Sequence, residues 1–371
     1  MKVSKSRALS KAELEAFAAE LDQLQADVRK KVGAEDAAYI VRIWRLVRYS
    51  GVLGRGLLFL GWFWPAWIVG TLLLAFSKIV ENMELGHNVM HGQYDWMNDP
   101  RFNGPDYEWD VVGTSDNWRY THNYKHHTYT NVQDVDEDIG YGVLRVFPEQ
   151  PWSIANLFQP LYALLLALFF QWGVALQRLE VGRYFAGTIS ARELYEEFKP
   201  TGNKIKRQLV KDYVVFPLLA LVLFVPVLPV FLGNLVANGL RNLWTYMIIF
   251  CGHFTADVEL FPQSVLENES RGHWYVRQLR GSSNISGGRF FHMMSGNLSH
   301  QIEHHMFPDM PSYRYAEVAE GVREICARYG QNYNTGSIWR QFGQVLWRIV
   351  RYSFPSSAPQ TNTQWMADDT K

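Results

Sequence analysis

The chain has 371 residues, of which 48% are hydrophobic and 15% aromatic, and 36 basic side chains balance 36 acidic ones. The zero net charge offers no argument for a nucleic-acid partner. Because two cysteines, Cys251 and Cys326, are too few for a disulfide framework, a four-cysteine zinc site or an iron–sulfur cluster, any redox chemistry must rest on other ligands or on a partner protein.

Residues 1–34 have the pattern of an amphipathic helix. Apolar residues recur at spacings of three and four between Leu14 and Val28, and Ser10 can form a capping box with Glu13. We expect the apolar stripe to pack on the rest of the fold. A coiled-coil contact between two chains is the alternative, although the repeat is short for it.

Residues 1–50 are too polar for a cleavable secretory signal, so we expect the N-terminus to stay in the cytoplasm. Arg42, Arg45 and Arg48 precede the first apolar stretch. Such basic residues are typical of the place where a chain enters a membrane from the cytoplasm.

The first apolar stretch runs from Gly56 to Phe76 without a charge, which is about the length of one bilayer span. Pro65 lies in its middle. We therefore predict a hairpin of two spans, 51–64 and 67–85, because the second helix would then bring the first histidines to the cytoplasmic end. Hydropathy alone leaves a single span open, which would put those histidines on the side opposite the N-terminus.

The chain has eleven histidines, and eight of them form three clusters. In a helix, positions i and i+4 lie about 40° apart on one face, so each cluster can offer two imidazoles to one metal ion. Position i+5 is turned about another 100°, so a doublet suits a site that holds two ions. Imidazole binds iron, zinc, copper and nickel, and the spacing does not name the metal. The clusters are His87 and His91; His122, His126 and His127; and His300, His304 and His305.

Residues 92–150 are polar and aromatic and end in an acidic run, Asp134, Asp136, Glu137 and Asp138. The simplest interpretation of this run is a solvated loop, and metal ligation by its carboxylates is the alternative.

Three further apolar stretches follow, at 156–176, 213–232 and 235–251. The second and third histidine clusters can share a site only if the number of crossings between them is even. The segment 177–211 is strongly basic and is therefore expected in the cytoplasm. We predict that 156–176 is an interfacial or re-entrant helix, and that the chain has four spans with both termini in the cytoplasm.

His253 lies at the expected cytoplasmic end of the fourth span. A histidine beside a membrane span is costly unless it is paired or binds a metal, so we predict a ninth ligand here. His273 and His292 lie outside the clusters and are expected to be ordinary surface or core residues.

The C-terminal part continues with a cytoplasmic stretch at 256–299 and a helical region at 311–352, whose apolar positions are expected to cover the metal region. We divide the chain into an N-terminal cytoplasmic region, 1–50, a membrane domain with a cytoplasmic cap, 51–352, and a polar tail expected to be disordered, 353–371.

Eight or nine imidazoles around two ions leave room for oxygen and suit redox iron better than hydrolytic zinc, which normally keeps three or four protein ligands per ion. A ferritin-like di-iron protein would need two Glu-x-x-His motifs. Only Glu84 to His87 matches, so that class is disfavoured.

Over residues 40–330 the chain resembles the membrane fatty acid desaturase family. The resemblance is carried by the three histidine clusters and their settings, GHNVMHG, HHTYTNVQDVDEDIG and SGNLSHQIEHHMFPDMPSYRY. It implies an all-α integral membrane protein with four transmembrane helices and a cytoplasmic helical cap that holds a histidine-rich, non-haem di-iron site.

The resemblance also implies the ligands, namely the eight clustered histidines together with His253. Many relatives have H-x-x-HH or Q-x-x-HH as the third cluster, which aligns Gln301 with the first position. Either side chain could face the iron, and we expect His300 because imidazole is the better ligand.

The chain is most similar to bacterial acyl-CoA desaturases, which implies insertion of a cis double bond, commonly at Δ9, into a long-chain acyl-CoA or acyl-lipid with O2 and two external electrons. No haem-binding His-Pro-Gly-Gly stretch occurs. We therefore expect a separate ferredoxin, flavin reductase or cytochrome b5 to dock on the cytoplasmic face of a bacterial inner membrane. A membrane di-iron hydroxylase and a non-enzymatic lipid- or metal-binding protein are the alternatives.

Overall fold

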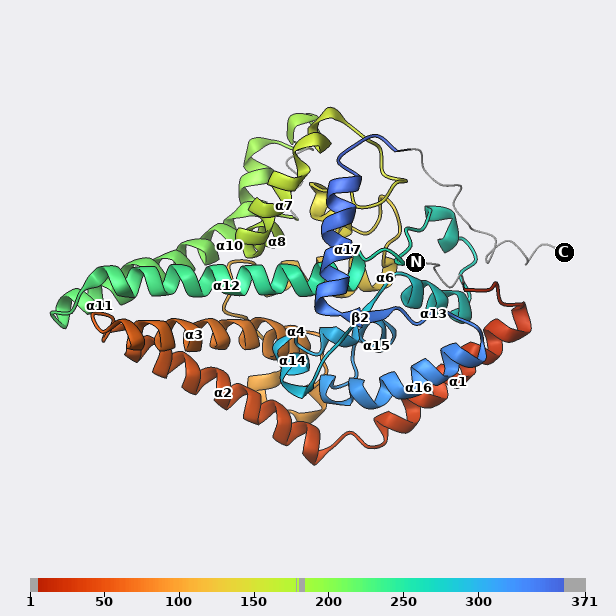
Figure 1. Ribbon diagram of the computed structural model, residues 1–371, viewed down its shortest axis with the longest axis horizontal. Helices are drawn as coiled ribbons and strands as arrows, with labels where there is room; N and C mark the ends of the chain where they lie inside the picture. The colour runs from red at the N-terminus through yellow and green to blue at the C-terminus, as the bar shows by residue number, and fades with distance from the viewer. Residues whose placement is uncertain (1–5, 178, 180–183, 357–371) are drawn as a thin grey trace. The chain divides into compact units, whose positions relative to one another are not determined.

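The computed structural model describes residues 6–177, 179 and 184–356, and most of them are helical (Figure 1). The chain forms two compact units that alternate along the sequence. Unit 1 comprises Met1–Ala37, His122–Leu164 and Met247–Lys371, and unit 2 comprises Ala38–Thr121 and Leu165–Tyr246.

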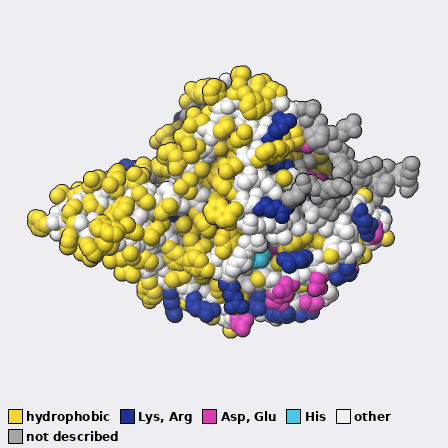
Figure 2. Space-filling view, in the orientation of Figure 1, with side chains coloured by type: hydrophobic (Ala, Val, Ile, Leu, Met, Phe, Trp, Pro, Cys, Tyr) yellow, Lys and Arg dark blue, Asp and Glu magenta, His cyan; other side chains and the backbone are white. Residues whose placement is uncertain are grey.

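Unit 2 is built around long apolar helices. Four of them, α2, α3, α11 and α12, share a core of Leu58, Leu74, Ala75, Ala220, Val230 and Ala237. Hydrophobic side chains also cover the outside of this region (Figure 2). The helical segments that lie in unit 2 or enter it are α2 (Ala34–Leu58), α3 (Trp64–Val80), a π-helix (Glu81–Gly86), α4 (His87–Met90), 3-10 turns at Asp95–Met97 and Pro100–Phe102, α5 (Ser115–Trp118), a second π-helix (Arg119–His126), α8 (Phe170–Leu176), α10 (Ala191–Val210), a third π-helix (Lys211–Val215), α11 (Phe216–Val222) and α12 (Val227–His253).

The predicted turn near Pro65 is present. Helix α2 ends at Leu58, α3 begins at Trp64, and Pro65 lies in the first turn of α3, where no backbone N–H is needed. The two helices approach closely, since a methyl group on Gly54 would lie 2.9 Å from the carbonyl oxygen of Gly70. Helix α2 begins far before the predicted span, so residue 50 lies inside a helix.

The turn between the last two predicted spans was placed wrongly, near residues 233–234. The chain reverses at residues 223–226, where Phe224 has a φ of 56° and Pro226 ends helical hydrogen bonding. Gly233 lies inside α12, where a methyl group would come within 2.4 Å of Leu58. The glycine therefore serves helix packing and not a turn.

One continuous helical stretch of the described residues, Trp64–Met90, is long and apolar enough to cross a membrane. A second candidate exists if Ile154–Leu168 and Phe170–Leu176, which are bent by 96°, count as one span. A bend of this size is compatible with the interfacial or re-entrant helix predicted at 156–176. The four-span arrangement stays a prediction.

The apolar helices of unit 2 enclose an ionic cluster around Asp212. Its carboxylate lies 2.8 Å from Lys78 Nζ and 2.9 Å from Arg55 Nη2, and it accepts a hydrogen bond of 3.0 Å from Asn238. Charged groups in an apolar helical environment are expected to face inward and to be paired. These contacts join α2, α3 and α12 to the third π-helix.

Unit 1 holds most of the shorter elements. Its helical segments are α1 (Lys11–Arg29), α6 (His127–Tyr129), a 3-10 turn at Ile139–Gly142, another at Ile154–Phe158 that leads into α7 (Gln159–Leu168), a turn at Gln263–Leu266, α13 (Arg271–Arg280), α14 (Arg289–Met294), a turn at Leu298–His300, α15 (Gln301–Met306), a turn at Ser312–Arg314, α16 (Tyr315–Arg328) and α17 (Ile338–Arg351). A parallel pair of strands, β1 (Asn284–Ser286) and β2 (Thr335–Ser337), aligns Ile285 with Gly336.

Helix α1 confirms the amphipathic prediction. Ser10 and Glu13 form the capping box, and the buried stripe packs against α13 and α16. The approach to α13 is close, because a methyl group on Gly272 would lie 2.4 Å from the carbonyl oxygen of Leu14. The region 311–352 is largely helical as predicted, while most of the predicted disordered tail, 357–371, lies outside the described residues.

Candidate metal centre

The second histidine cluster lies on the π-helix that runs to His126. Hydrogen bonds of a π-helix run from i to i+5, so residues five apart come onto one face. The Nε2 atoms of His122 and His127 are accordingly 3.3 Å apart. The i, i+4 pair expected from α-helical spacing is present as well, since the rings of His122 and His126 stack with centroids 5.2 Å apart. The contact between His122 and His127 was not predicted.

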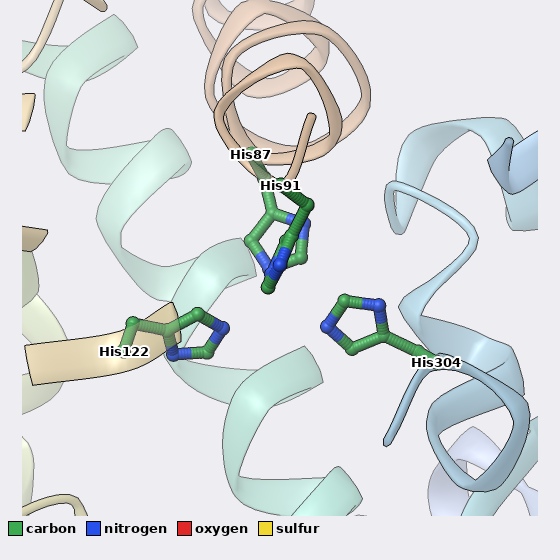
Figure 3. A group of neighbouring side chains, drawn as sticks. All are labelled: His87, His91, His122 and His304. Carbon is green, nitrogen blue, oxygen red and sulfur yellow. The ribbon is translucent and has the colours of Figure 1, made fainter. Parts of the chain in front are cut away.

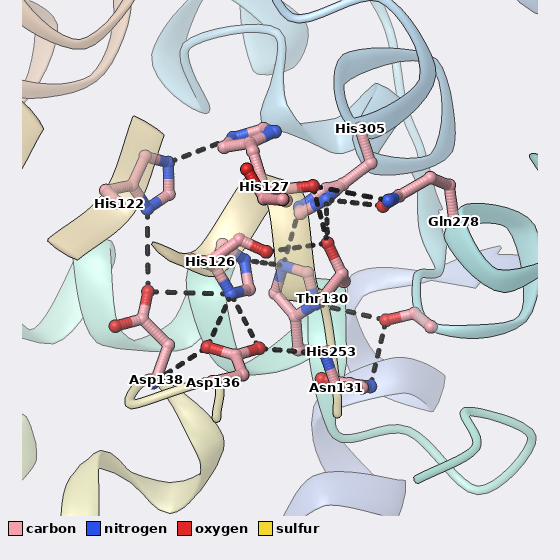
Figure 4. Close-up of polar contacts among 12 residues, drawn as sticks. His122, His126, His127, Thr130, Asn131, Asp136, Asp138, His253, Gln278 and His305 are labelled. Carbon is pink, nitrogen blue, oxygen red and sulfur yellow. Dashed lines mark hydrogen bonds and ion pairs between the residues drawn. The ribbon is translucent and has the colours of Figure 1, made fainter. Parts of the chain in front are cut away.

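His126 lies in two groups of possible metal ligands, one with His122 and Asp138 and one with His253 and His305. The Nε2 atom of His253 lies 3.3 Å from Nε2 of His126 and 3.1 Å from Nε2 of His305, and all three side chains are buried (Figure 4). The two members of the doublet thus have different nearest ring nitrogens, His122 for His127 and His253 for His126. The number of ions stays a prediction.

The outer nitrogens of this group each face a hydrogen-bond acceptor. His126 Nδ1 lies 2.9 Å from an oxygen of Asp136, His253 Nδ1 lies 3.1 Å from the carbonyl oxygen of Gly281, and His305 Nδ1 lies 3.2 Å from Oε1 of Gln278. A proton on each Nδ1 satisfies these acceptors and leaves a lone pair on each Nε2. Three lone pairs that converge in a buried space repel one another unless a cation lies between them. The donor set therefore fits a transition-metal ion such as iron.

The acidic run that follows the cluster is not the solvated loop that we predicted. Asp136 and Asp138 are 5% and 9% exposed, and only Asp134 of the four lies open to solvent. Asp136 accepts hydrogen bonds from His126 and, at 2.8 Å, from the backbone N–H of Asn131. These donors compensate for the burial of a carboxylate.

The same carboxylates control the basicity of His126. Burial alone would lower the pKa of this imidazole, but the charges of Asp136 and Asp138 raise it to about 8. A carboxylate on the outer nitrogen makes the inner nitrogen a stronger metal ligand. His122 faces Asp138 at 3.5 Å, and there burial prevails and lowers the pKa.

His304 joins the other histidines of unit 1. Its ring lies 4.7 Å from the ring of His127, and His122 and His304 face each other with centroids 6.4 Å apart (Figure 3). Its Nδ1 is 3.2 Å from the hydroxyl of Tyr315, which donates in turn to the carbonyl oxygen of Phe307.

The first cluster belongs to unit 2. His87 and His91 extend side by side from one helix, with ring centroids 4.7 Å apart, as the i, i+4 spacing predicts (Figure 3). Trp118 lies edge-on to both rings, at 5.2 and 5.4 Å, and fixes their orientation.

The structure does not bring His300 to the other histidines. Its backbone, with φ of −105° and ψ of 54°, precedes α15, so the expected helical i, i+4 relation to His304 is absent. The His300 ring stacks on His292 at 4.6 Å, and burial lowers its pKa to about 3. The side-chain amide of Gln301 lies 2.9 Å from Nε2 of His253 instead.

A pocket of unit 1 opens beside these groups. Metal-ligand candidates, other polar residues and apolar side chains all contribute to its lining. Its lining residues are His122, His126, Asn131, Asp138, Tyr141, Ile249, His253, Phe254 and Gln301.

The sequence analysis gave metal ligation by the acidic run only as an alternative, and it did not foresee the residues that hydrogen-bond the histidines. Asp136 and Asp138 could have been suspected because they follow a histidine cluster closely. Gln278 and Tyr315 gave no such signal, since they reach the site only through the packing of α13 and α16.

Comparison with known proteins gives a consistent result. Residues 62–337 match the family model described as fatty acid desaturase. The chain is 44% identical over 367 residues to an NADPH-dependent stearoyl-CoA 9-desaturase of Mycobacterium tuberculosis, which covers 96% of this chain and 86% of the relative. It is 28% identical over 304 residues to an sn-1 linoleoyl-lipid 6-desaturase of Synechocystis, with 79% of this chain and 81% of the relative covered.

Proposed function

The chain belongs to the fatty acid desaturase family, and from this membership we propose that it is a membrane-bound fatty acyl desaturase that forms a cis Δ9 double bond in a saturated long-chain acyl-CoA. The observation that carries the proposal is the convergence of imidazoles from His126, His253 and His305 in a chain 44% identical to a relative named as a stearoyl-CoA 9-desaturase.

We propose that the centre is a pair of non-haem iron ions. In this assignment one ion is held by His126, His253 and His305, and the other by His122, His127 and His304 with the first-cluster histidines. Within unit 1, this division is supported by the 3.3 Å contacts of His127 with His122 and of His126 with His253. For the first cluster, it is supported by the close approach of the His87 and His91 rings. His300 stays a predicted ligand, for which Gln301 is the competitor. The complete proposed set is His87, His91, His122, His126, His127, His253, His300, His304 and His305.

Iron, when bound, supplies the activation of O2 that lets two C–H bonds of adjacent methylenes be broken. Overall, the substrate gives two electrons and two protons, an external donor gives two electrons, solvent gives two protons, and O2 leaves as two water molecules. Asp136 keeps the proton of His126 on Nδ1, and Gln278 does the same for His305, so the inner nitrogens stay available.

The two external electrons must come from another protein. Both cysteines are buried in the described structure and stand alone, so neither offers a thiol pair for electron transfer. We propose a separate ferredoxin, flavin reductase or cytochrome b5, which draws on NADPH by analogy with the name of the mycobacterial relative.

We propose an integral location in a bacterial inner membrane, with four spans and with both termini and the metal centre on the cytoplasmic side. The two chain reversals of unit 2 support it. Trp62 and Trp64 at the first reversal are 69% and 70% exposed, and Phe224 at the second is 98% exposed. Exposed aromatic residues at helix ends are typical of membrane interfaces.

The decisive experiment is gas chromatography of the fatty acids of a host that expresses the wild-type chain or its His304→Ala variant at equal levels. A new Δ9 monounsaturated acid with the wild type alone supports the proposal. Production of an alcohol would instead favour the alternative, a membrane di-iron hydroxylase of a lipid or alkane. No new product from a metal-loaded protein supplied with acyl-CoA and a competent donor would refute both.

A further inference from the structure

Helix α17 of unit 1 buries polar side chains and exposes large apolar ones. At about 100° per residue, Gln341, Val345 and Arg348 share one side of the helix, and all three are buried. Ile349 is buried on the same side, which therefore carries two polar and two apolar residues. The opposite side carries Trp339, Leu346, Trp347 and Val350, which are 78%, 46%, 58% and 54% exposed. A helix that covers a water-soluble core has the opposite arrangement, with its apolar stripe inward.

Polar contacts fix this orientation. Gln341 donates to the carbonyl oxygen of Asn284 at 3.0 Å. Arg348 donates to the carbonyl oxygens of Ala256 and Val258 at 3.2 and 3.0 Å, and its guanidinium lies 4.7 Å from the centroid of the Phe147 ring. Rotation of α17 to bury its tryptophans would break these bonds and leave buried polar groups unsatisfied.

A second apolar surface continues from α17. Trp152 donates to the carbonyl oxygen of Ser353 at 2.9 Å, and Arg145 donates to the carbonyl oxygens of Tyr352 and Phe354, each at 3.3 Å. These bonds hold the C-terminal end of α17 beside the segment that begins at Ile154. The exposed side chains of that segment within unit 1 include Ile154, Phe158, Leu161 and Leu164, at 68%, 58%, 53% and 55%.

The charge on α17 is of one sign. The helix contains no acidic residue, and exposed Arg340 and Arg351 lie together on one flank of the apolar stripe, about 20° apart around the axis. Hydrophobic and basic side chains adjoin in this region of the surface (Figure 2). A stripe of tryptophan and aliphatic residues beside arginines is the composition of helices that lie in the membrane interface.

We propose that α17 is an interfacial helix that lies along the surface of a bilayer containing anionic lipids. Its tryptophans, Leu346 and Val350 enter the boundary between headgroups and acyl chains, while Arg340 and Arg351 contact lipid phosphates. The apolar segment at 154–164 continues this surface and belongs to the bent pair that is long and apolar enough to cross a membrane, which favours a lipid surface over a protein partner. The proposal does not depend on the reaction that the metal centre catalyses.

The test uses the full-length protein in lipid nanodiscs of phosphatidylcholine with phosphatidylglycerol. Because both native cysteines are buried, a nitroxide label can be directed to Trp347→Cys or Val350→Cys. Collision rates with O2, which concentrates in lipid, and with a water-soluble nickel complex then give the depth of the label. Glu15→Cys, at an exposed position of α1, is the matched control.

Labels at 347 and 350 are expected about 5–10 Å below the phosphates, with high O2 and low nickel accessibility. The control label should remain open to nickel. Nickel accessibility equal to that of the control overturns the proposal, as does protection from both reagents, which would indicate a protein contact. Protection that develops only after an electron-donor protein is added would likewise mean that α17 is a docking site for that protein.

Substitution of Arg340 and Arg351 provides a second, independent test. The double variant Arg340→Gln and Arg351→Gln should place the 347 label at a shallower depth in discs that contain phosphatidylglycerol, and should have little effect in phosphatidylcholine alone. An equal effect in both lipids would exclude recognition of anionic headgroups. The readout needs no enzyme activity, so it fails or succeeds separately from the proposed desaturation.

Discussion

His122 and His127 are five residues apart in the chain, and their Nε2 atoms are 3.3 Å apart in the structure. His126, next to His127, points instead to His253 at 3.3 Å. A π-helix brings position i+5 closer to the face of position i than an α-helix does, so His127 reaches His122, while the ring of His126 still stacks on that of His122 at 5.2 Å. In the proposed di-iron centre, these three histidines would serve both ions.

If His126 and His127 bind different ions, the effects of paired histidine substitutions on iron content can be predicted. His127→Ala and His126→Ala should each reduce the iron content per chain by about half, because each removes a ligand from a different ion. The double variant with His122→Ala and His127→Ala should lose no more than either single variant. The double variant with His126→Ala and His127→Ala should lose nearly all iron, measured by mass spectrometry of the purified protein.

His273→Ala is the control for this series, because His273 lies outside both groups and contacts Ser270. Equal iron loss in the two double variants would contradict the division of the doublet.

Asp136 should be essential although it lies in a run that the sequence suggests is solvated. Asp136→Asn removes the charge that raises the pKa of His126 to about 8 and places an amide where three donors converge. Loss of such a supporting group typically costs roughly 10–100-fold in metal affinity or activity. We expect that loss in iron-binding titrations of the purified protein.

Asp134→Asn provides the comparison. Asp134 belongs to the same run, is exposed, and has a φ of 61°, which asparagine also adopts readily. It should bind iron like the wild type, and a matching defect in both variants would indicate a general effect of charge near the site.

Ligand chemistry alone favours His300 over Gln301 at the metal centre, but the structure places Gln301 nearer to it. Gln301 lies 2.9 Å from His253 and lines the pocket, whereas His300 contacts His292. Gln301→Ala should therefore reduce desaturation in the host assay by at least about tenfold, and His300→Ala should reduce it less. The reverse order would restore His300 as the ligand.

Gly272 should be intolerant of even a methyl group, because that group would lie 2.4 Å from the backbone oxygen of Leu14. Gly272→Ala is expected to separate α1 from α13 and to cost about 1–3 kcal/mol of stability. A lower unfolding temperature in detergent, at unchanged α-helix content, would be the measured result.

Gly33→Ala is the matched control, since a methyl group there would meet no atom within 4 Å. If both variants unfold at the wild-type temperature, the close packing of α1 on α13 is incorrect.

Local patterns in the sequence correctly predicted features that form within a single helix or turn. The capping box and buried stripe of α1, the pairing of His87 with His91 and the reversal near Pro65 all follow from residues within a few positions of one another. The reversal at residues 223–226 was missed because the apolar residues run on through it, so that the stretches at 213–232 and 235–251 were divided too late in the chain.

The sequence by itself determined the family, the helical class and the residue types of a metal centre, because histidine spacing and hydrophobic composition are properties of the chain. Only the tertiary structure decided which nitrogens converge, that Asp136 is buried against His126, and that Gln301 and not His300 faces His253. The reason is physical: these outcomes depend on an extra residue in a helical turn and on packing between residues that are 10, 48 and 127 positions apart. Neither changes the pattern that the sequence displays.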